Sequence, residues 1–194
     1  MARACEVGAG SSLLAELLWR RHRGLDGLLI TDALPEMLEH SRRWERCGAA
    51  LAVAPAASLP VPDASLDLVV GSLADPYDDD SLWEEVSRVL APGGLCVLTA
   101  PSAVWAHRFR VEGSPGHAAE FVLADERTVY VPSLVRSPEE ERRLIEDHGL
   151  TIASEASTAL AALDEQISSK LRVLAPEDAV VQGFVAIASA SRSG

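Results

Sequence analysis

The sequence predicts an α/β protein in which a mostly parallel sheet carries helices on both faces. Along residues 1–100, short apolar segments alternate with amphipathic ones, and this alternation is typical of a doubly wound parallel sheet. The first apolar segment runs directly into a Gly-x-Gly turn that opens a helix. The chain has 194 residues, of which 48% are hydrophobic, so it suits one domain, residues 1–194, with a sizeable core.

The first strand, residues 2–7, leads into the turn Gly8-Ala9-Gly10 and then into a helix over residues 13–19. A first glycine permits a sharp turn, and a second lets a ligand approach the backbone without a Cβ in the way. The helix start adds unpaired N–H groups and the positive end of its dipole. The third glycine of a dinucleotide fingerprint is absent, because Leu13 stands in its place, so an ordinary strand-to-helix turn remains an alternative.

The second strand, residues 28–31, ends at Asp32, about 20 residues past the glycines. That spacing suits a carboxylate that accepts hydrogen bonds from ribose hydroxyls. Asp32 could instead cap the helix that begins near Pro35, and the two interpretations are compatible. In a doubly wound sheet Gly8, Gly10, Asp32 and Ser72 converge beyond the carboxyl ends of the strands, where ligands bind.

The remaining elements of the first half follow the same pattern. Asp78-Asp79-Asp80-Ser81 is typical of a helix N-terminus, and we prefer this interpretation to a metal site. Pro92-Gly93-Gly94 should separate a helix from a strand. We expect a helix at 35–46, a strand at 50–54, a loop at 55–64, a strand at 66–70, a helix at 82–90 and a strand at 95–100.

Residues 101–136 interrupt the alternation as an insert, with a hairpin formed by residues 120–123 and 128–131. The insert leaves the end of the fifth strand, beside the expected ligand site, so we interpret it as the substrate wall. His107, His117 and Tyr130 are the candidates for proton transfer, although for each histidine we favour a plain surface residue over catalysis. The side chains assigned to this wall are Trp105, His107, Arg108, Phe109, His117, Phe121, Arg127 and Tyr130.

After the insert, Ser137-Pro138-Glu139-Glu140 forms a capping box with proline at the first helical position. The helix should run to His148 and end at Gly149. We then expect a strand at 150–153, a helix around 160–174 and a last strand at 180–188.

Composition limits the class of protein. The net charge of −12 disfavours a nucleic-acid partner, because phosphate binding needs clustered lysine and arginine. No apolar run is long enough to span a membrane and no secretory leader is visible, so we expect a cytoplasmic protein. Cys5, Cys47 and Cys96 are few and scattered, which indicates reduced thiols and no metal site.

Four segments in this order resemble the class I S-adenosylmethionine-dependent methyltransferases, in particular their type 11 group. They are Cys5–Gly10, Ile30–Leu38, Ser58–Val70 and Glu85–Leu95. The resemblance implies a Rossmann-like sheet of seven strands whose last strand is antiparallel, with S-adenosyl-L-methionine as cofactor. It also implies that Asp32 holds the ribose, Ala33 lies against the adenine, and Ala56 offers it a backbone N–H. Ser72 would face the methionine moiety, and the amino-acid end would lie at Glu6, Gly8, Ala9 and Gly10.

Two departures from the family pattern stand out. Pro55 occupies a position where many members have an aspartate that binds the adenine amino group. The helices that precede the first motif in the family, and cover the cofactor, are also absent from this sequence. We therefore consider three explanations. The sequence starts late relative to the family, the cofactor site is open, or a partner chain or a second copy covers that site.

The function expected from the resemblance is methyl transfer to a small-molecule acceptor. Two alternatives remain open at this point. The chain could be a catalytically degenerate partner subunit that keeps only the fold, or a methyltransferase-like cyclase that uses the same fold.

Overall fold

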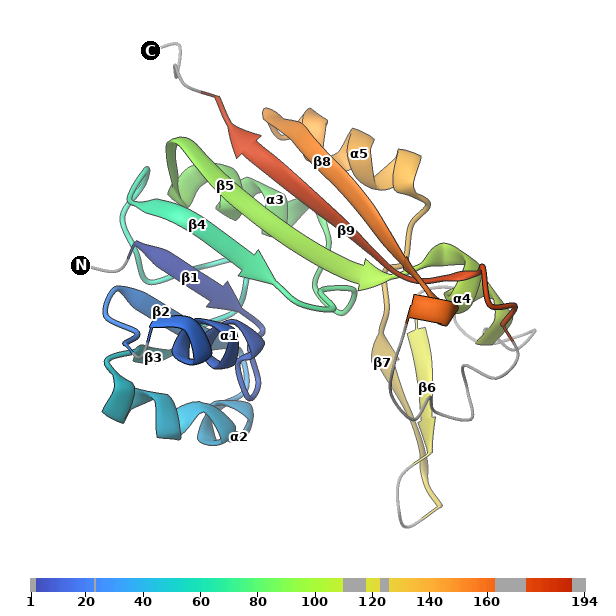
Figure 1. Cartoon of the computed structure of the whole chain (residues 1–194), viewed down its shortest axis with the longest axis horizontal. Coiled ribbons are helices and arrows are strands. Elements are labelled where there is room, and N and C mark those ends of the chain that lie inside the picture. Colours follow the sequence, from blue (N-terminus) through green and yellow to red (C-terminus); the bar gives the residue numbers. More distant parts are fainter. Residues whose placement is uncertain (1–2, 23, 110–117, 123–125, 163–173, 190–194) are drawn as a thin grey trace.

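The computed structural model describes residues 3–22, 24–109, 118–122, 126–162 and 174–189. In this part of the chain, a seven-stranded sheet has the order β3-β2-β1-β4-β5-β9-β8 (Figure 1). The order reverses between β1 and β4, which is the switch point where such sheets bind ligands. The strands are β1 (Ala4–Val7), β2 (Leu28–Asp32), β3 (Ala50–Val53), β4 (Leu66–Gly71), β5 (Leu90–Pro101), β8 (Leu150–Ala159) and β9 (Ala179–Ala188).

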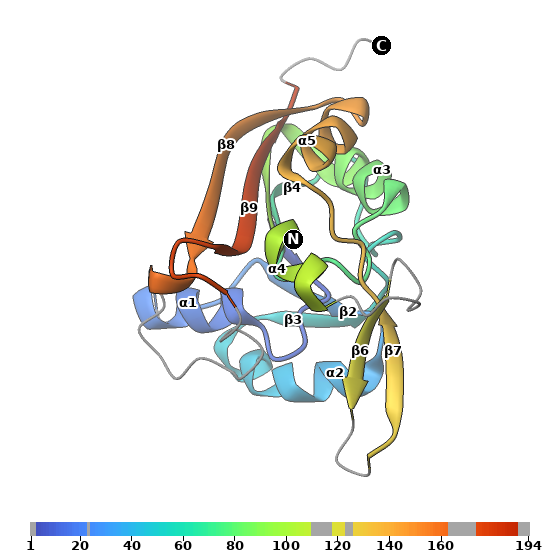
Figure 2. The same ribbon diagram turned by 90° about the vertical axis from the view of Figure 1, so that its right-hand side faces the viewer.

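Helices cover the sheet from both sides (Figure 2). On one side lie α1 (Leu13–His22), α2 (Pro35–Leu38) and the 3₁₀ helix η1 (Glu39–Cys47), and on the other lie α3 (Asp80–Val89) and α5 (Pro138–Asp147). Strand pairing is parallel from β3 through to β5, whereas β9 runs antiparallel to β5 and β8. The expected α/β class, doubly wound sheet and antiparallel last strand are therefore confirmed.

Successive side chains of each strand point to opposite faces of the sheet, so the core is divided into two layers. On the side of α3 and α5, Val7, Trp83, Leu98 and Phe184 belong to one large buried cluster. On the side of α1 and η1, a smaller cluster contains Ala15, Ile30 and Trp44 among its buried members. Cys5 and Cys96 are buried and reduced, as small apolar core residues.

Between β5 and α5 the chain forms α4 (Ala103–Phe109) and the hairpin of β6 (Ala118–Val122) and β7 (Thr128–Pro132). The hairpin was expected from the sequence, and α4 was not. None of the helices in the described ranges combines the length and hydropathy that a membrane crossing requires.

The structure differs from the sequence expectations at three places, two in the bounds of a strand and one in the type of a helix. Pro92-Gly93-Gly94 was expected to separate a helix from a strand. It lies instead within β5, which already begins at Leu90 and bulges against β4. A Cβ on Gly94 would lie only 3.0 Å from the carbonyl oxygen of Leu66, which explains a glycine at this bulge. The segment 35–46 is one α turn followed by the longer 3₁₀ helix η1.

The third error concerns the end of the sheet. Strand β8 continues to Ala159 instead of stopping near Ala153, and the 3₁₀ helix η2 (Leu160–Ala162) follows it. The rest of the helix expected at 160–174, residues 163–173, lies outside the described residues.

Candidate functional site

The glycine turn connects β1 to α1 at the switch point. Gly8 and Gly10 have φ values of +57° and +49°, in the left-handed region that favours glycine, as expected from the sequence. The amide of Ala9 donates to the carbonyl oxygen of Thr31 at 2.9 Å, which attaches the turn to the neighbouring β2. The turn therefore has a fixed shape at the carboxyl edge of the sheet.

Asp32 lies beside this turn at the end of β2. One carboxylate oxygen accepts from the amide of Gly10 at 3.1 Å, and the other accepts from the amide of Leu34 at 3.0 Å. Asp32 thus supports the start of the next helical segment, as one interpretation of the sequence expected, and it also holds the turn; its role toward a ribose stays a prediction. The residue is 8% exposed, and each oxygen keeps acceptor capacity beyond the bond it makes.

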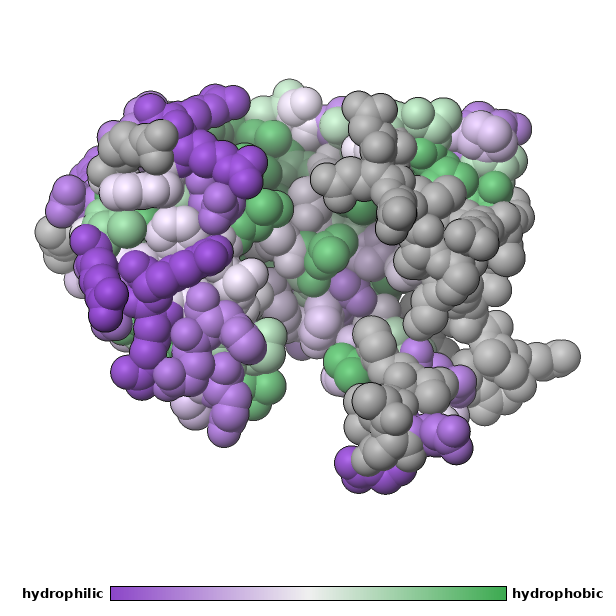
Figure 3. Space-filling model, turned by 60° about the horizontal axis from the view of Figure 1, so that its bottom comes forward, coloured by the Kyte–Doolittle hydropathy of each residue, from purple (hydrophilic) through white to green (hydrophobic). Residues whose placement is uncertain are grey.

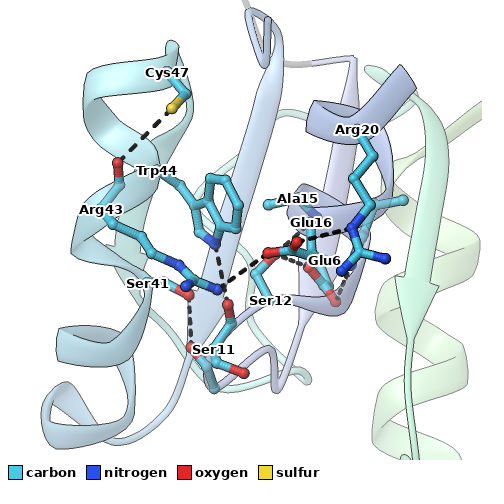
Figure 4. Close-up of polar contacts among 12 residues, drawn as sticks. Glu6, Ser11, Ser12, Ala15, Glu16, Arg20, Ser41, Arg43, Trp44 and Cys47 are labelled. Carbon is cyan, nitrogen blue, oxygen red and sulfur yellow. Dashed lines mark hydrogen bonds and ion pairs between the residues drawn. The ribbon is translucent and has the colours of Figure 1, made fainter. Parts of the chain in front are cut away.

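Glu6 belongs to the same edge but is used by the fold itself (Figure 4). Its carboxylate accepts from the hydroxyl of Ser12 and from the amide of Leu14, the latter at 3.1 Å. Ser12 in turn accepts from the amide of Ala15 at 3.1 Å, so the two residues together cap α1. Burial raises the pKa of Glu6, although the bonds from Ser12 and from backbone amides oppose the rise.

Two residues of η1 hold the turn from outside, and no sequence pattern indicates either of them. The hydroxyl of Ser41 donates to the carbonyl oxygen of Gly10 at 2.6 Å, and the indole of Trp44 donates to that of Ser11 at 3.1 Å. Figure 4 shows both side chains directed at the turn. The carbonyl groups are thereby turned toward η1.

The remaining residues predicted to bind the cofactor follow the carboxyl ends of β2, β3 and β4. Ser72 follows β4, whose last residue Gly71 pairs with Val7, so Ser72 and Gly8 are side by side. Ala33 is exposed next to Asp32. The loop after β3 also reaches Asp32, because the amide of Ala54 donates to the Asp32 carbonyl oxygen at 2.9 Å.

Ala56, two residues further along this loop, is half-buried, while Pro55 is exposed. In the view from below, the molecular surface is hollowed between the hydrophilic part around α2 and the side of the β6–β7 hairpin (Figure 3). The carboxyl ends of β1, β2 and β4 point toward this side of the molecule (Figure 1).

Tyr77 is a further residue at this edge that sequence reasoning missed. It follows β4, and its hydroxyl donates to the carbonyl oxygen of Val7 at 2.9 Å. A Cβ on Gly8 would overlap the ring and hydroxyl of Tyr77, so the space above the first glycine is filled by protein. Burial, followed by the nearby charges of Asp32 and Glu6, raises the pKa of Tyr77 and keeps its phenol protonated.

Two of the three candidates for proton transfer, His107 and Tyr130, lie in the described part of the chain, and their hydrogen bonds there are not with the glycine turn. His107 is exposed on α4, and its Nδ1 lies 2.6 Å from the carbonyl oxygen of Ala103 in the same helix. Tyr130 is 52% exposed and donates to Glu120 across the hairpin at 3.1 Å, and this bond raises its pKa. His117 lies outside the described residues.

The side chains around the glycine turn determine which kind of ligand could bind at this edge of the sheet. Among the described residues, no three His, Cys, Asp or Glu side chains form a group that could hold a metal ion. The edge instead offers a glycine turn and one carboxylate, that of Asp32, whose oxygens keep acceptor capacity, whereas amides at the start of α1 are already engaged by Glu6 and Ser12. A carboxylate at this place suits ribose hydroxyls. The chemistry of Asp32, a mostly buried carboxylate that can accept further hydrogen bonds, is therefore compatible with the ribose of the expected cofactor.

Comparisons with known proteins agree with this geometry. Residues 5–98 match the family model described as a methyltransferase domain. No protein of curated function matches the sequence. An S-adenosylmethionine-dependent methyltransferase from Methanosarcina mazei has a similar fold, with a TM-score of 0.72 and 17% identity over 97% of this chain and 92% of that chain.

Two further solved structures share the fold. One is the complex of a methyltransferase with its Trm112 activator from Haloferax volcanii, with a TM-score of 0.70 and 19% identity over 98% of this chain and 83% of that chain. The other is the [4+2]-cyclase SpnF, with a TM-score of 0.69 and 14% identity over 98% of this chain and 75% of that chain. S-adenosylmethionine is the cofactor that the family match and this fold imply. The matched domain over residues 5–98 and the strand order together show a methyltransferase-like sequence on the fold of S-adenosylmethionine-dependent methyltransferases.

Proposed function

We propose that the chain catalyses methyl transfer from S-adenosylmethionine to a small-molecule acceptor. The observation that carries the proposal is the 3.1 Å contact between the Gly10 amide and the Asp32 carboxylate. It joins the glycine turn to the end of β2 at the switch point of the sheet, where this class of fold binds nucleotide-like ligands.

Each predicted residue has a role in this proposal. Asp32 accepts hydrogen bonds from the ribose, Ala33 lies against the adenine, and the amide of Ala56 faces it. Gly8, Ala9, Gly10 and Ser72 surround the amino-acid end. Glu6 acts through Ser12 and Leu14, since its carboxylate is already engaged with the start of α1.

The chain's main contribution to the reaction is alignment. When bound, the cofactor supplies a methyl group on a sulfonium ion, a good leaving group. The protein then has to hold the acceptor in line with that methyl group, and a base is needed only when the acceptor must lose a proton. His107, His117 and Tyr130 stay candidates for that base, although Tyr130 as described donates its proton to Glu120.

The acceptor is proposed to be a small molecule because of charge and position. The net charge of −12 opposes binding of nucleic acid. The segment from α4 to the β6–β7 hairpin follows the carboxyl end of β5, next to the switch point, which is where an acceptor would enter. This location favours residues 101–136 as the acceptor side.

Calorimetric titration with S-adenosylmethionine and S-adenosylhomocysteine tests the proposal. We expect micromolar-range binding by the unaltered chain and at least about tenfold weaker binding by Asp32→Asn, since a buried hydrogen bond to a charged group contributes roughly 1.5–3 kcal/mol. Asp147→Asn removes an exposed carboxylate on α5 and is the matched control. Equal affinity of Asp32→Asn and Asp147→Asn would refute the assigned site.

The alternatives give different results in the same experiments. Binding accompanied by a product with an unchanged number of methyl groups would indicate a cyclase. Absence of binding, together with stable association with a second protein or a second copy in light scattering, would indicate a partner subunit. Transfer of labelled methyl from S-adenosylmethionine to an acceptor, lost in Asp32→Asn, would support the methyltransferase.

A further inference from the structure

We propose that Tyr77 is a positioning residue that holds the glycine turn in its binding shape, and that residues 133–136 hold the loop that carries Tyr77. This inference rests on the proposed function, because the turn matters only if it binds the cofactor. It concerns a residue 70 positions away from the turn in sequence.

The phenol of Tyr77 acts at the first peptide of the turn. Its hydroxyl donates at 2.9 Å to the carbonyl oxygen of Val7, the last residue of β1. Because the N–H and C=O of a trans peptide point in opposite directions, this bond turns the amide of Gly8 away from Tyr77. The ring simultaneously fills the space where a Cβ on Gly8 would lie. Tyr77 therefore restricts both the orientation and the movement of the Val7–Gly8 peptide.

The loop that carries Tyr77 is itself anchored at several points. On the side of β5, the amide of Leu73 donates to the hydroxyl of Thr99 at 3.0 Å, and the amide of Ala74 donates to the Thr99 carbonyl oxygen at 2.9 Å. On the side of α3, the indole of Trp83 donates to the carboxylate of Asp78 at 2.9 Å. These bonds determine where the backbone of Tyr77 lies.

A third set of anchors comes from the segment just after the hairpin. The hydroxyl of Ser133 donates to the carboxylate of Asp75 at 2.7 Å, and the amide of Leu134 donates to the Asp75 carbonyl oxygen at 2.8 Å. The guanidinium of Arg136 donates to the carbonyl oxygen of Asp78 at 2.6 Å. Asp75 and Asp78 flank Tyr77, so the end of the acceptor-side insert is connected to the glycine turn through this tyrosine.

The contacts distinguish positioning from catalysis. A tyrosine acting as a base would need a free, deprotonated oxygen, whereas this hydroxyl donates its proton to a backbone carbonyl. Burial and the neighbouring carboxylates also raise the pKa of the phenol. Tyr77 thus acts on the cofactor site through Val7 and Gly8.

The first measurement is the affinity for S-adenosylhomocysteine by calorimetry. We expect Tyr77→Phe to raise the dissociation constant about five- to tenfold, which corresponds to the loss of one hydrogen bond. Ser133→Ala should raise it about two- to threefold, with little further effect in the Tyr77→Phe background because both act through one loop. Ser189→Ala, which removes a hydroxyl-to-carbonyl bond at the opposite edge of the sheet, should leave the affinity unchanged.

The second measurement needs no ligand. Amide hydrogen exchange at Gly8, Ala9 and Gly10 should be at least about threefold faster in Tyr77→Phe and unchanged in Ser189→Ala, if the phenol restricts the turn. Unchanged exchange at these amides, or an unchanged affinity for a chain that binds the ligand, would overturn the inference. If the unaltered chain binds no S-adenosylhomocysteine, the proposed function fails while the exchange result still decides the role of Tyr77.

Discussion

The carboxyl group of Glu141 on α5 should make the stability of the chain fall as the pH rises. Glu141 and Asp78 are almost completely buried, and one guanidinium faces both, with Arg136 Nη1 at 3.4 Å from Asp78 and 3.6 Å from Glu141. Asp78 also accepts from the Trp83 indole at 2.9 Å, whereas neither carboxylate oxygen of Glu141 has such a donor. One positive charge cannot compensate two buried negative ones, so Glu141 is the group that keeps its proton.

The magnitude follows from the two pKa values. Burial first, and then the charge of Asp78, raises the pKa of Glu141 from 4.5 to about 8. The folded chain therefore retains a proton that the unfolded chain releases between these pH values, and the free energy of unfolding decreases across this window. At about 1.4 kcal/mol for each tenfold change in proton affinity the ceiling is roughly 5 kcal/mol, and we expect ~1–3 kcal/mol because Asp78 shares the effect.

Urea unfolding, followed by tryptophan fluorescence at about pH 5 and about pH 8, measures this window. Glu141→Gln stays neutral at both values, so it should be more stable than the unaltered chain at the higher pH and lose that advantage at the lower one. Glu146→Gln removes an exposed carboxylate from the same helix and should show no such window. It would refute the reasoning if the free energy of unfolding of Glu141→Gln were lower than that of the unaltered chain by the same amount at both pH values.

Two further substitutions test the packing around the site. Gly8→Ala should lower the free energy of unfolding by about 2–4 kcal/mol, because it combines a left-handed φ with overlap against Tyr77. Gly93→Ala, which has a φ of +78° and no neighbour within 4 Å, should cost only about 1–2 kcal/mol in the same urea experiment. Arg88→Met should lower stability by about 2–3 kcal/mol and expose the loop at residues 55–64 to proteolysis, because Glu85 loses its charged partner. Equal losses for the two alanine variants, or an unchanged cleavage pattern in Arg88→Met, would contradict these expectations.

Features with a local cause could be predicted from the sequence. The capping box of Ser137 and Glu140 forms as expected, and Asp79 caps α3 by accepting from the amides of Ser81 and Leu82. The glycine turn and Asp32 were also found, because the chirality of strand-helix-strand units brings the carboxyl ends of β1 and β2 together. In each case the signal is a residue type at a fixed distance from an element boundary.

The features that were missed depend on contacts between distant segments. The extension of β8 carries exposed side chains at Ala153–Thr158, so it shows none of the alternation that marks a half-buried strand. Its register is determined by pairing with β9 alone. Tyr77 follows a strand as part of an unremarkable Asp-Pro-Tyr loop, and nothing in that loop indicates that its hydroxyl reaches Val7.

The two carboxylates at the switch point show why the fold alone does not determine a binding residue. Glu6 lies one residue before the end of β1 and Asp32 ends the neighbouring parallel strand β2, and the family resemblance assigned both to the cofactor. The hydrogen bonds of Glu6 are directed inward to Ser12 and Leu14, so its burial is compensated by the helix that it caps. Asp32 makes one bond with each oxygen and keeps a small exposed fraction of 8%, so it can still accept from a ligand. The two residues thus differ in how far the fold already uses their hydrogen-bond acceptors. For this reason the assignment of the site depends on Asp32 more than on any other side chain.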